Sequence, residues 1–194
     1  MIAGAILAGG RARRFGGQDK ARLLVQGRSI IDRQIEVLRS VADDVFLVGG
    51  KPAHDPERFA DLGVPVFPDV VSGAGALGGI LTALESTTAD RVIVVACDMP
   101  FLVTGLLQAL TRLAESSDGA WVRTARGPEP LIACYRQTAR GRIREAVEAG
   151  DLKAASLDQR LQLRELTEQD VAAFGPVELL LANLNTPEDY AQVQ

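Results

Sequence analysis

The chain has 194 residues, of which 47% are hydrophobic and 24% are charged. This length suits one domain with a substantial core, and the composition is far from that of a disordered segment. The net charge of -4 excludes a general electrostatic footprint for nucleic acid or for an anionic membrane.

The cysteines and the N-terminus indicate the compartment. Cys97 and Cys134 stand singly in apolar runs without CxxC spacing, which favours reduced thiols in the core. Arg11 follows the first apolar stretch instead of preceding it, so the N-terminus lacks the order of a secretory signal. No apolar run approaches the ~20 residues that span a bilayer. We expect a cytoplasmic protein with no membrane or nucleic-acid partner.

Short apolar runs alternate with amphipathic segments in the first half of the chain. Near-continuous apolar runs predict the buried strands of a parallel sheet that is covered on both faces. These strands are expected at residues 3–8, 45–48, 64–67 and 91–96. Helical patterns lie at residues 29–40, 56–62 and 79–86, and Ser29 is placed to cap the first of them.

After residue 100 the pattern becomes more mixed. We expect helices at 102–116 and 139–149, a short helix that opens at Thr186-Pro187, and strands at 119–124, 130–135, 161–166 and 177–184. There is no linker or repeat. The sequence therefore predicts a single α/β domain over residues 1–194, with a Rossmann-like, mostly parallel central sheet, helices on both faces and a mixed C-terminal half.

The first strand leads directly into a glycine-rich, basic loop. Gly9 and Gly10 allow backbone N–H groups to close around phosphate oxygens, and ligands of open α/β sheets bind at the carboxyl ends of strands. Four cations fall within ten residues of an otherwise acidic chain: Arg11, Arg13, Arg14 and Lys20. This is not a Walker loop, because Lys20 follows Asp19 and precedes Ala21. The loop predicts a polyphosphate site, with a solvated surface turn as the alternative.

A second glycine cluster, at residues 73–78, is an alternative candidate for the nucleotide site. Gly73, Gly75 and Gly78 fit G-x-G-x-x-G, and Asp98 follows twenty residues after Gly78. This is the spacing of a dinucleotide-binding fingerprint, so an NAD-binding oxidoreductase is one alternative. However, the preceding predicted strand ends at Phe67, too early for the fingerprint, and the basic loop would then have no task. The cluster, including Gly75, can instead form a backbone wall against a nucleoside.

Two aspartates follow predicted strands. Asp69 can accept hydrogen bonds from a sugar or base, or it can simply be a turn residue. Asp98 follows residues 91–96, and a carboxylate at the carboxyl end of a central strand suits Mg²⁺. A phosphate site needs such an ion nearby, whereas the alternative for Asp98 is a cap of the next helix. Catalysis by Cys97 is not supported, because the only histidine is His54, in a polar segment.

These motifs occur together in one family. The loop over residues 7–20 resembles the signature of nucleotidyltransferases of the sugar-nucleotide type. Residues 96–100, residues 130–135 and the run Asn-Leu-Asn-Thr-Pro-Glu-Asp at 183–189 narrow the match. The chain is similar to the molybdenum cofactor guanylyltransferase family over nearly its whole length, with the motifs in family order.

The resemblance implies an enzyme with a nucleotidyltransferase fold that transfers GMP from GTP to the terminal phosphate of molybdopterin, with Mg²⁺ as cofactor. Residues 1–100 would form the nucleotide-binding half and residues 101–194 the acceptor-binding half. Asn183 and Asn185 would line the reacting phosphates or the pterin. Together with the loop and wall described above, the residues expected at the nucleotide are Leu7, Ala8, Gly9, Gly10, Lys20, Asp69, Gly75 and Asp98, of which Asp98 would hold Mg²⁺.

The implied reaction needs little acid–base chemistry. A phosphate nucleophile is ionised at neutral pH, so catalysis would rest on positioning and charge stabilisation. Arg14 and Lys20 would neutralise the leaving pyrophosphate, while Asp98 would hold the ion. We expect a monomer with GTP and molybdopterin as substrates and with contacts to the proteins that deliver the cofactor.

Two departures from the family pattern fall in the nucleoside half. The family shows Gly-Pro-Leu-Ala-Gly where this chain has Gly-Ala-Leu-Gly-Gly at 75–79, and Gly49-Gly50 stands where a nucleotide-contacting asparagine is common. The sequence therefore leaves open whether the nucleotide substrate carries guanine or cytosine. The alternatives are a related nucleotidyltransferase that uses CTP or another phosphorylated acceptor, and a regulator that binds GTP without catalysis.

Overall fold

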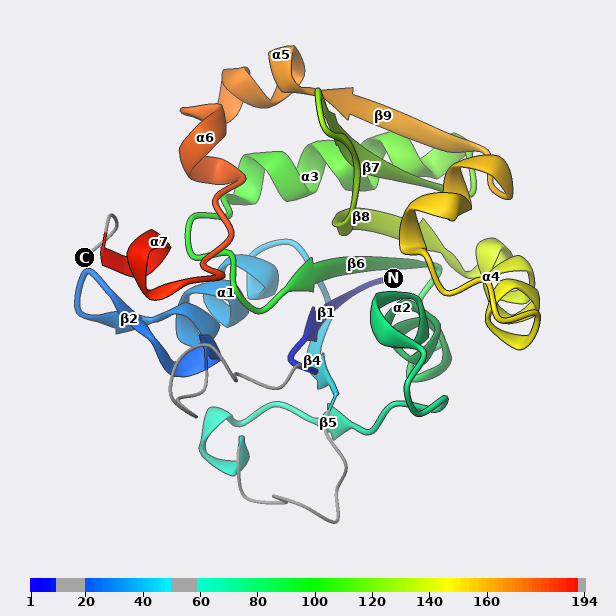
Figure 1. The fold of residues 1–194 in the computed structure, drawn as a ribbon, viewed down its shortest axis with the longest axis horizontal. Coiled ribbons are helices and arrows are strands. Elements are labelled where there is room, and N and C mark those ends of the chain that lie inside the picture. The colour runs from blue at the N-terminus through cyan, green and yellow to red at the C-terminus, as the bar shows by residue number, and fades with distance from the viewer. Residues whose placement is uncertain (10–19, 50–58, 192–194) are drawn as a thin grey trace.

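A seven-stranded sheet in the order β5-β4-β1-β6-β8-β7-β9 organises the computed structural model, which describes residues 1–9, 20–49 and 59–191 (Figure 1). β1 pairs in parallel with β4 and β6, β4 with β5, and β7 with β9. β8 is antiparallel to both of its neighbours, β6 and β7. The predicted mostly parallel sheet is confirmed, and the mixed part lies in the second half of the chain.

The strands of this sheet are β1 (Ile2–Leu7), β4 (Asp44–Val48), β5 (Val66–Phe67), β6 (Arg91–Ala96), β7 (Gly119–Thr124), β8 (Gly127–Arg136) and β9 (Leu163–Thr167). A two-stranded hairpin is formed by β2 (Leu24–Val25) and β3 (Arg28–Ser29). The helices are α1 (Ile30–Arg39), α2 (Gly75–Glu85), α3 (Thr104–Leu113), α4 (Arg140–Glu148), α5 (Glu168–Val171), α6 (Val177–Leu180) and α7 (Pro187–Ala191).

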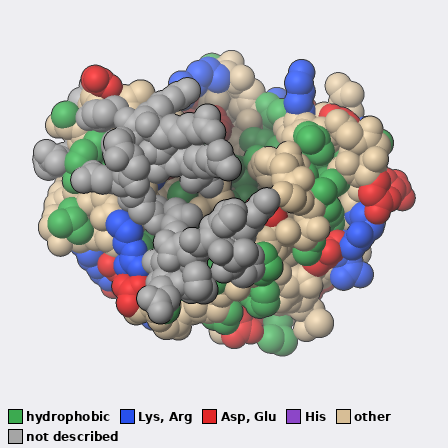
Figure 2. Space-filling model, turned by 60° about the horizontal axis from the view of Figure 1, so that its bottom comes forward, with side chains coloured by type: hydrophobic (Ala, Val, Ile, Leu, Met, Phe, Trp, Pro, Cys, Tyr) green, Lys and Arg blue, Asp and Glu red, His purple; other side chains and the backbone are tan. Residues whose placement is uncertain are grey.

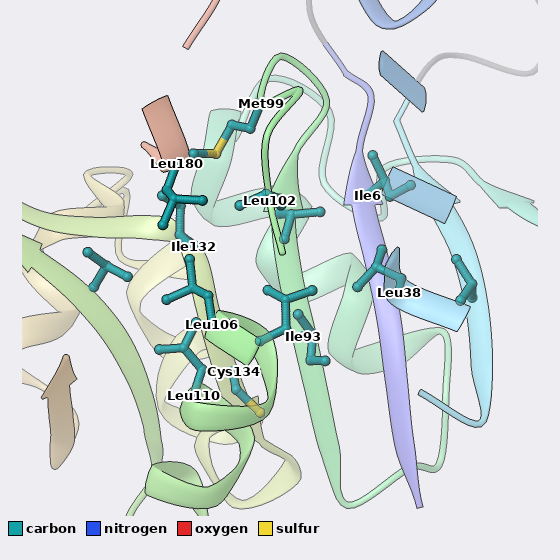
Figure 3. Packing of buried hydrophobic residues seen from close by; sticks show 14 of the residues in the cluster. Ile6, Leu38, Ile93, Met99, Leu102, Leu106, Leu110, Ile132, Cys134 and Leu180 are labelled. Atoms are coloured by element: carbon teal, nitrogen blue, oxygen red, sulfur yellow. The ribbon is translucent and has the colours of Figure 1, made fainter. Parts of the chain in front are cut away.

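Each face of the sheet buries its own hydrophobic cluster. On one face, Ile6 of β1 and Ile93 of β6 pack with Leu38 of α1 and Leu106 of α3 (Figure 3). On the other face, alternate residues of the same two strands pack against α2 and α4, as Leu77 of α2 shows. Because β1 and β6 are buried on both faces, β1 is apolar throughout and β6 is apolar after Arg91, which is why the two strands could be predicted from the sequence.

Helix α1 begins where the sequence predicts it. The Ser29 side chain accepts a hydrogen bond from the N–H of Asp32, at 3.2 Å, and so caps the helix. Ile30, Ile31 and Ile35 face the protein interior. Gln34 lies in the same buried stripe, which is unusual for a polar side chain.

Several predicted boundaries shift in the structure. The helix predicted at 79–86 begins earlier, as α2 at Gly75, because the glycine cluster itself enters the helix. The strand predicted at 64–67 is limited to Val66–Phe67. Of the helix predicted at 56–62, residues 56–58 lie outside the described residues and Ala60–Leu62 form a 3-10 turn.

The strand predicted at residues 177–184 is wrong. Val177–Leu180 is the short helix α6, which begins directly after Pro176. The carbonyl of Pro176 accepts hydrogen bonds from the N–H groups of Leu179 and Leu180, so the backbone closes a helical turn. A short apolar run does not by itself distinguish a strand from a buried helical segment.

The surface carries mixed charges. On the face shown in Figure 2, the described Lys and Arg side chains are interspersed with Asp, Glu and apolar side chains. Within residues 1–9, 20–49 and 59–191, helices with both the length and the apolar character of a membrane span are absent.

Candidate active site

The carboxyl ends of β1 and β6 lie side by side at the point where the strand order reverses. From β1 the chain proceeds outward to β4 and β5, and then returns to β6 on the opposite side of β1. Leu7 at the end of β1 pairs with Ala96 at the end of β6. Open α/β sheets bind ligands outside such a switch point. The basic loop after β1 therefore starts, at Ala8-Gly9, beside the turn that carries Asp98.

Three predicted site residues from distant parts of the sequence meet at this edge. Lys20 Nζ lies 3.8 Å from Asp98 Oδ2 and donates a hydrogen bond to Asn185 Oδ1, at 2.9 Å. The side chains of Lys20 and Asp98 are 21% and 19% exposed, so a ligand can still reach both. A cation, a carboxylate and an amide thus share one partly desolvated position.

The Asp98 carboxylate is suited to a cation. Its Oδ1 atom is buried and has no hydrogen-bond partner in the described part of the chain. Burial raises the pKa of Asp98, and the Lys20 ammonium opposes this rise. Such an oxygen is a ligand that a hard divalent ion accepts.

The carboxylate of Asp98 is the metal ligand expected from the sequence. Over the described ranges, groups of three or more His, Cys, Asp and Glu side chains arranged for a metal are not found. Mg²⁺, the ion expected from the sequence, takes one or two carboxylates and completes its shell with phosphate oxygens and water.

Asp69 lies next to Gly9, where the glycine-rich, basic loop starts. A Cβ built on Gly9 would come within 3.7 Å of Asp69 Oδ2. The residue is exposed, and partial desolvation of its carboxyl raises its pKa. The structure therefore places Asp69 at the same edge of the sheet as Leu7, Ala8 and Gly9.

The end of β4 approaches the loop so closely that only glycine fits. Gly49 has a φ of +124°, and a Cβ there would lie 2.3 Å from the backbone nitrogen of Gly9. The N–H of Ala8 donates to the carbonyl of Val48, at 2.7 Å, which holds the two segments together. At Gly49, where the chain departs from the family pattern, the backbone thus packs directly against the backbone of Gly9.

The second glycine cluster opens helix α2. Residues 68–74 separate β5 from α2, so Gly73 does not leave a strand directly, as a dinucleotide fingerprint requires. Gly75 is the first residue of α2, with a φ of +59°. A Cβ on Gly79 would lie 2.8 Å from Leu7 Cδ1, so the glycine allows α2 to pack tightly on β1.

The C-terminal segment reaches the same turn. The N–H of Leu184 donates to the carbonyl of Asp98, at 3.0 Å, and this bond sets the positions of Asn183 and Asn185 on either side. Asn185 is exposed and Asn183 is half-buried. Asp189 Oδ2 accepts from the N–H groups of Asn185 and Thr186, each at 2.9 Å, which orders the start of α7.

Some predicted residues lie outside the described part of the chain. Gly10 and Arg14 belong to residues 10–19, and His54 belongs to residues 50–58. Of the two cysteines that were expected in the core, Cys134 is fully buried, whereas Cys97 is half-buried. Burial raises the pKa of the Cys134 thiol to about 12, so it is inert at neutral pH.

Comparison with known proteins identifies the family. Residues 4–168 match the family described as "MobA-like NTP transferase domain". A relative from Pelotomaculum thermopropionicum, named "Probable molybdenum cofactor guanylyltransferase", is 34% identical over 98% of this chain and 91% of its own length.

Solved structures share the fold. Molybdopterin-guanine dinucleotide biosynthesis protein A from Archaeoglobus fulgidus has a TM-score of 0.85 and 24% identity, with 98% of this chain and 96% of that one covered. The Rv0371c protein of Mycobacterium tuberculosis, solved in complex with manganese, has a TM-score of 0.66 and 18% identity, with 99% and 97% covered. The family match and the full-length relative show that the chain belongs to the MobA-like NTP transferase family, a family of nucleotidyltransferases.

Proposed function

We propose that the protein transfers GMP from GTP to the terminal phosphate of molybdopterin and releases pyrophosphate. The observation that carries this proposal is the meeting of Lys20, Asp98 and Asn185 at the switch point of the sheet, in a chain whose full-length relative is named for this activity. In this proposal residues 1–100 bind the nucleotide and residues 101–194 bind the acceptor.

The reaction is a substitution at phosphorus. An oxygen of the acceptor's terminal phosphate attacks the α-phosphorus of GTP, and the bond from that phosphorus to the α–β bridging oxygen breaks. The electron pair of the broken bond leaves with pyrophosphate. The attacking phosphate oxygen is already ionised at neutral pH, so the site needs cations and positioning and does not need a general base.

We assign the divalent ion, Mg²⁺, to Asp98. The unpartnered, buried Oδ1 atom supports this assignment. The use of a divalent ion as such is supported by the Mycobacterium tuberculosis protein of the same fold, which was solved in complex with manganese. The ion, when bound, would neutralise charge on the phosphate oxygens. Lys20 is close enough to Asp98 for one phosphate group to contact both the Lys20 ammonium and an ion held by Asp98.

The other predicted site residues are assigned roles at the same edge of the sheet. We propose that Leu7, Ala8, Gly9 and Gly10 bind the phosphates through the backbone and that Arg14 helps Lys20 to neutralise the pyrophosphate. Asp69 and Gly75 would contact the nucleoside, and Asn183 and Asn185 the acceptor. The role of Asn185 is supported by the hydrogen bond that it accepts from Lys20, because this bond brings a residue proposed to bind the acceptor next to one proposed to bind the phosphates of GTP.

A label-transfer assay tests this function. The protein is incubated with Mg²⁺, molybdopterin and GTP labelled at the α-phosphate, and the products are separated. We expect the label in a molybdopterin guanine dinucleotide, with release of unlabelled pyrophosphate. Parallel reactions use CTP, a sugar phosphate and a phospholactate. Transfer from CTP in preference to GTP, transfer only to another acceptor, or binding of GTP without transfer would each contradict the proposal.

A further inference from the structure

A buried glutamine holds the turn that carries Asp98. Gln34 lies on α1, 2% exposed, in the apolar stripe that faces the sheet. Its Nε2 atom donates to the carbonyl of Ala96, at 2.7 Å, and to the carbonyl of Met99, at 3.0 Å. These two carbonyls belong to the residues that flank Cys97-Asp98 in the chain. One amide group, with two N–H bonds, therefore clamps both ends of this two-residue turn.

Backbone contacts hold the same turn from two other directions. The N–H of Cys97 donates to the carbonyl of Leu7, at 3.3 Å, and the carbonyl of Asp98 accepts from the N–H of Leu184, at 3.0 Å. The turn is thus fixed by β1, by the C-terminal segment and by α1. The contact from α1 is made by a side chain, so a substitution can remove it without altering the backbone.

A glutamine is a costly choice for this position if packing is its only purpose. Burying a primary amide is unfavourable unless each polar atom finds a partner. The Nε2 atom has two partners, but Oε1 is buried and has none in the described residues. A leucine would continue the stripe of Ile31, Ile35 and Leu38 without burying an amide oxygen, but the carbonyls at the two ends of the turn would then lose this donor. The contribution of Gln34 therefore lies in the position of the turn.

We propose that Gln34 is a positioning residue, which places the Asp98 carboxylate for the divalent ion. The inference rests on the metal role proposed above for Asp98. Mg²⁺ demands near-ideal octahedral geometry at about 2.0–2.1 Å, so a small displacement of its protein ligand weakens binding. Loss of a group that orients a metal ligand lowers metal affinity by ~10–100-fold.

The chain contains a matched control at the other end of β6. Gln137 Nε2 donates to the carbonyls of Leu84 and Thr87, at 2.8 and 2.9 Å, the same arrangement as at Gln34. It lies beside Asp90, at the start of β6, because the N–H of Gln137 donates to the carbonyl of Asp90. β6 spans Arg91–Ala96, so Gln137 is ~20 Å from the Asp98 end of the strand.

The test measures metal binding directly. Mn²⁺ is titrated into wild-type protein, Gln34→Met and Gln137→Met in the presence of a GTP analogue that cannot be cleaved between the α- and β-phosphates. Free Mn²⁺ is followed by electron paramagnetic resonance. Methionine keeps the volume of glutamine and removes the donors. We expect Gln34→Met to weaken Mn²⁺ binding by about tenfold or more, and Gln137→Met to leave it unchanged, although both lower the Tm.

Each outcome has a distinct meaning. Unchanged Mn²⁺ affinity in Gln34→Met, or equal weakening in both variants, overturns the positioning role of Gln34. Absence of Mn²⁺ binding by the wild-type protein overturns the metal assignment itself, and the inference with it. Should Gln34→Met not fold, Gln34→Leu, which continues the apolar stripe of α1, replaces it with the same expected loss. Turnover of Gln34→Met should return toward the wild-type rate at saturating Mg²⁺.

Discussion

Lys20 contacts two other residues of the candidate site, which come from distant parts of the chain. Its ammonium group lies near Asp98, which follows β6, and bonds to Asn185, which precedes α7. In water such a surface pair is worth little, but these side chains are mostly desolvated and are placed to act on a third, anionic group. The value of Lys20 should therefore appear in catalysis more than in stability.

Replacing this cation should stop the reaction. Removal of one preorganised stabilising group typically costs ~10²–10³-fold in kcat, and we expect Lys20→Ala to lose at least that much. Steady-state rates at saturating GTP and Mg²⁺ measure the effect. Lys153→Ala, which removes an exposed lysine in the second half of the chain, is the control and should be unaffected. A near-normal rate in Lys20→Ala would remove this residue from the mechanism.

The buried carboxylate of Asp98 should make stability depend on pH. Burial raises its pKa, so the folded protein binds this proton more tightly than the unfolded chain does. The contribution of Asp98 to stability is therefore complete below the ordinary aspartate pKa of 3.8 and is lost as the pH rises through the folded-state value. At neutral pH the charged group lowers the free energy of unfolding.

Asp98→Asn removes this charge while keeping the size of the side chain. In metal-free buffer we expect a higher Tm than the wild type at neutral pH, with the difference shrinking as the pH falls toward about 4. For a chain of this size each kcal/mol corresponds to about 2–4 °C. Thermal unfolding across the pH range measures it. A lower Tm for Asp98→Asn at neutral pH would show that the carboxylate is stabilised by contacts, contrary to this account.

At the scale of elements, two short helices start with the same capping box. Thr186 Oγ1 accepts from the N–H of Asp189 at the start of α7, while the Asp189 carboxylate accepts from the N–H of Thr186. Thr167 and Asp170 form the same arrangement at α5. The box at α7 also bonds the N–H of Asn185, so it orders a predicted acceptor residue.

Thr186→Ala should affect substrate binding as well as stability. Loss of a threonine cap costs ~1 kcal/mol, and here it also loosens Asn185. We expect a raised KM for molybdopterin with little change in the KM for GTP. Thr167→Ala loses an equivalent cap at α5 and should leave both KM values unchanged. Equal effects of the two substitutions on KM would show that the α7 cap has no special connection with the acceptor.

A substitution at Gly49 tests the contact between the end of β4 and the loop that starts at Gly9. Gly49 and Gly127 share a φ of +124°, but a Cβ on Gly127 meets nothing within 4 Å, whereas one on Gly49 would collide with Gly9. Both alanine substitutions carry backbone strain of order 1–3 kcal/mol. We expect Gly49→Ala alone to raise the KM for GTP, because it must also displace the loop. GTP titration of both variants decides this, and a normal affinity in Gly49→Ala would contradict it.

At the scale of the whole molecule, the strands that the sequence predicted best are those that are buried on both faces of the sheet. β1 and residues 92–96 of β6 are apolar because both of their faces are buried, and this pattern located the loop and the aspartate that follow the two strands. Residues 177–184 were misread as a strand because a short apolar run fits either a strand or a helix, and the choice depends on what the run packs against.

Contacts between segments that are distant in the sequence could not be predicted from the hydrophobic pattern. Gln34 bonds to carbonyls 62 and 65 residues away, and in the sequence it is only one member of a helical stripe. The hydrogen bond from Lys20 to Asn185 joins residues 165 positions apart. The sequence motifs predicted that Lys20 and Asn185 serve one site, but only the fold shows that their side chains touch.

The central claim is that the loop after β1 and the aspartate after β6 hold one triphosphate and its ion. A crystal structure with Mn²⁺ and a non-cleavable GTP analogue, with anomalous diffraction at the manganese edge, tests it most directly. We expect one manganese peak within coordinating distance of the Asp98 carboxylate, with Lys20 against a phosphate of the same nucleotide. A nucleotide bound with its ion away from Asp98, or with its phosphates over the glycines at 73–78, would contradict it.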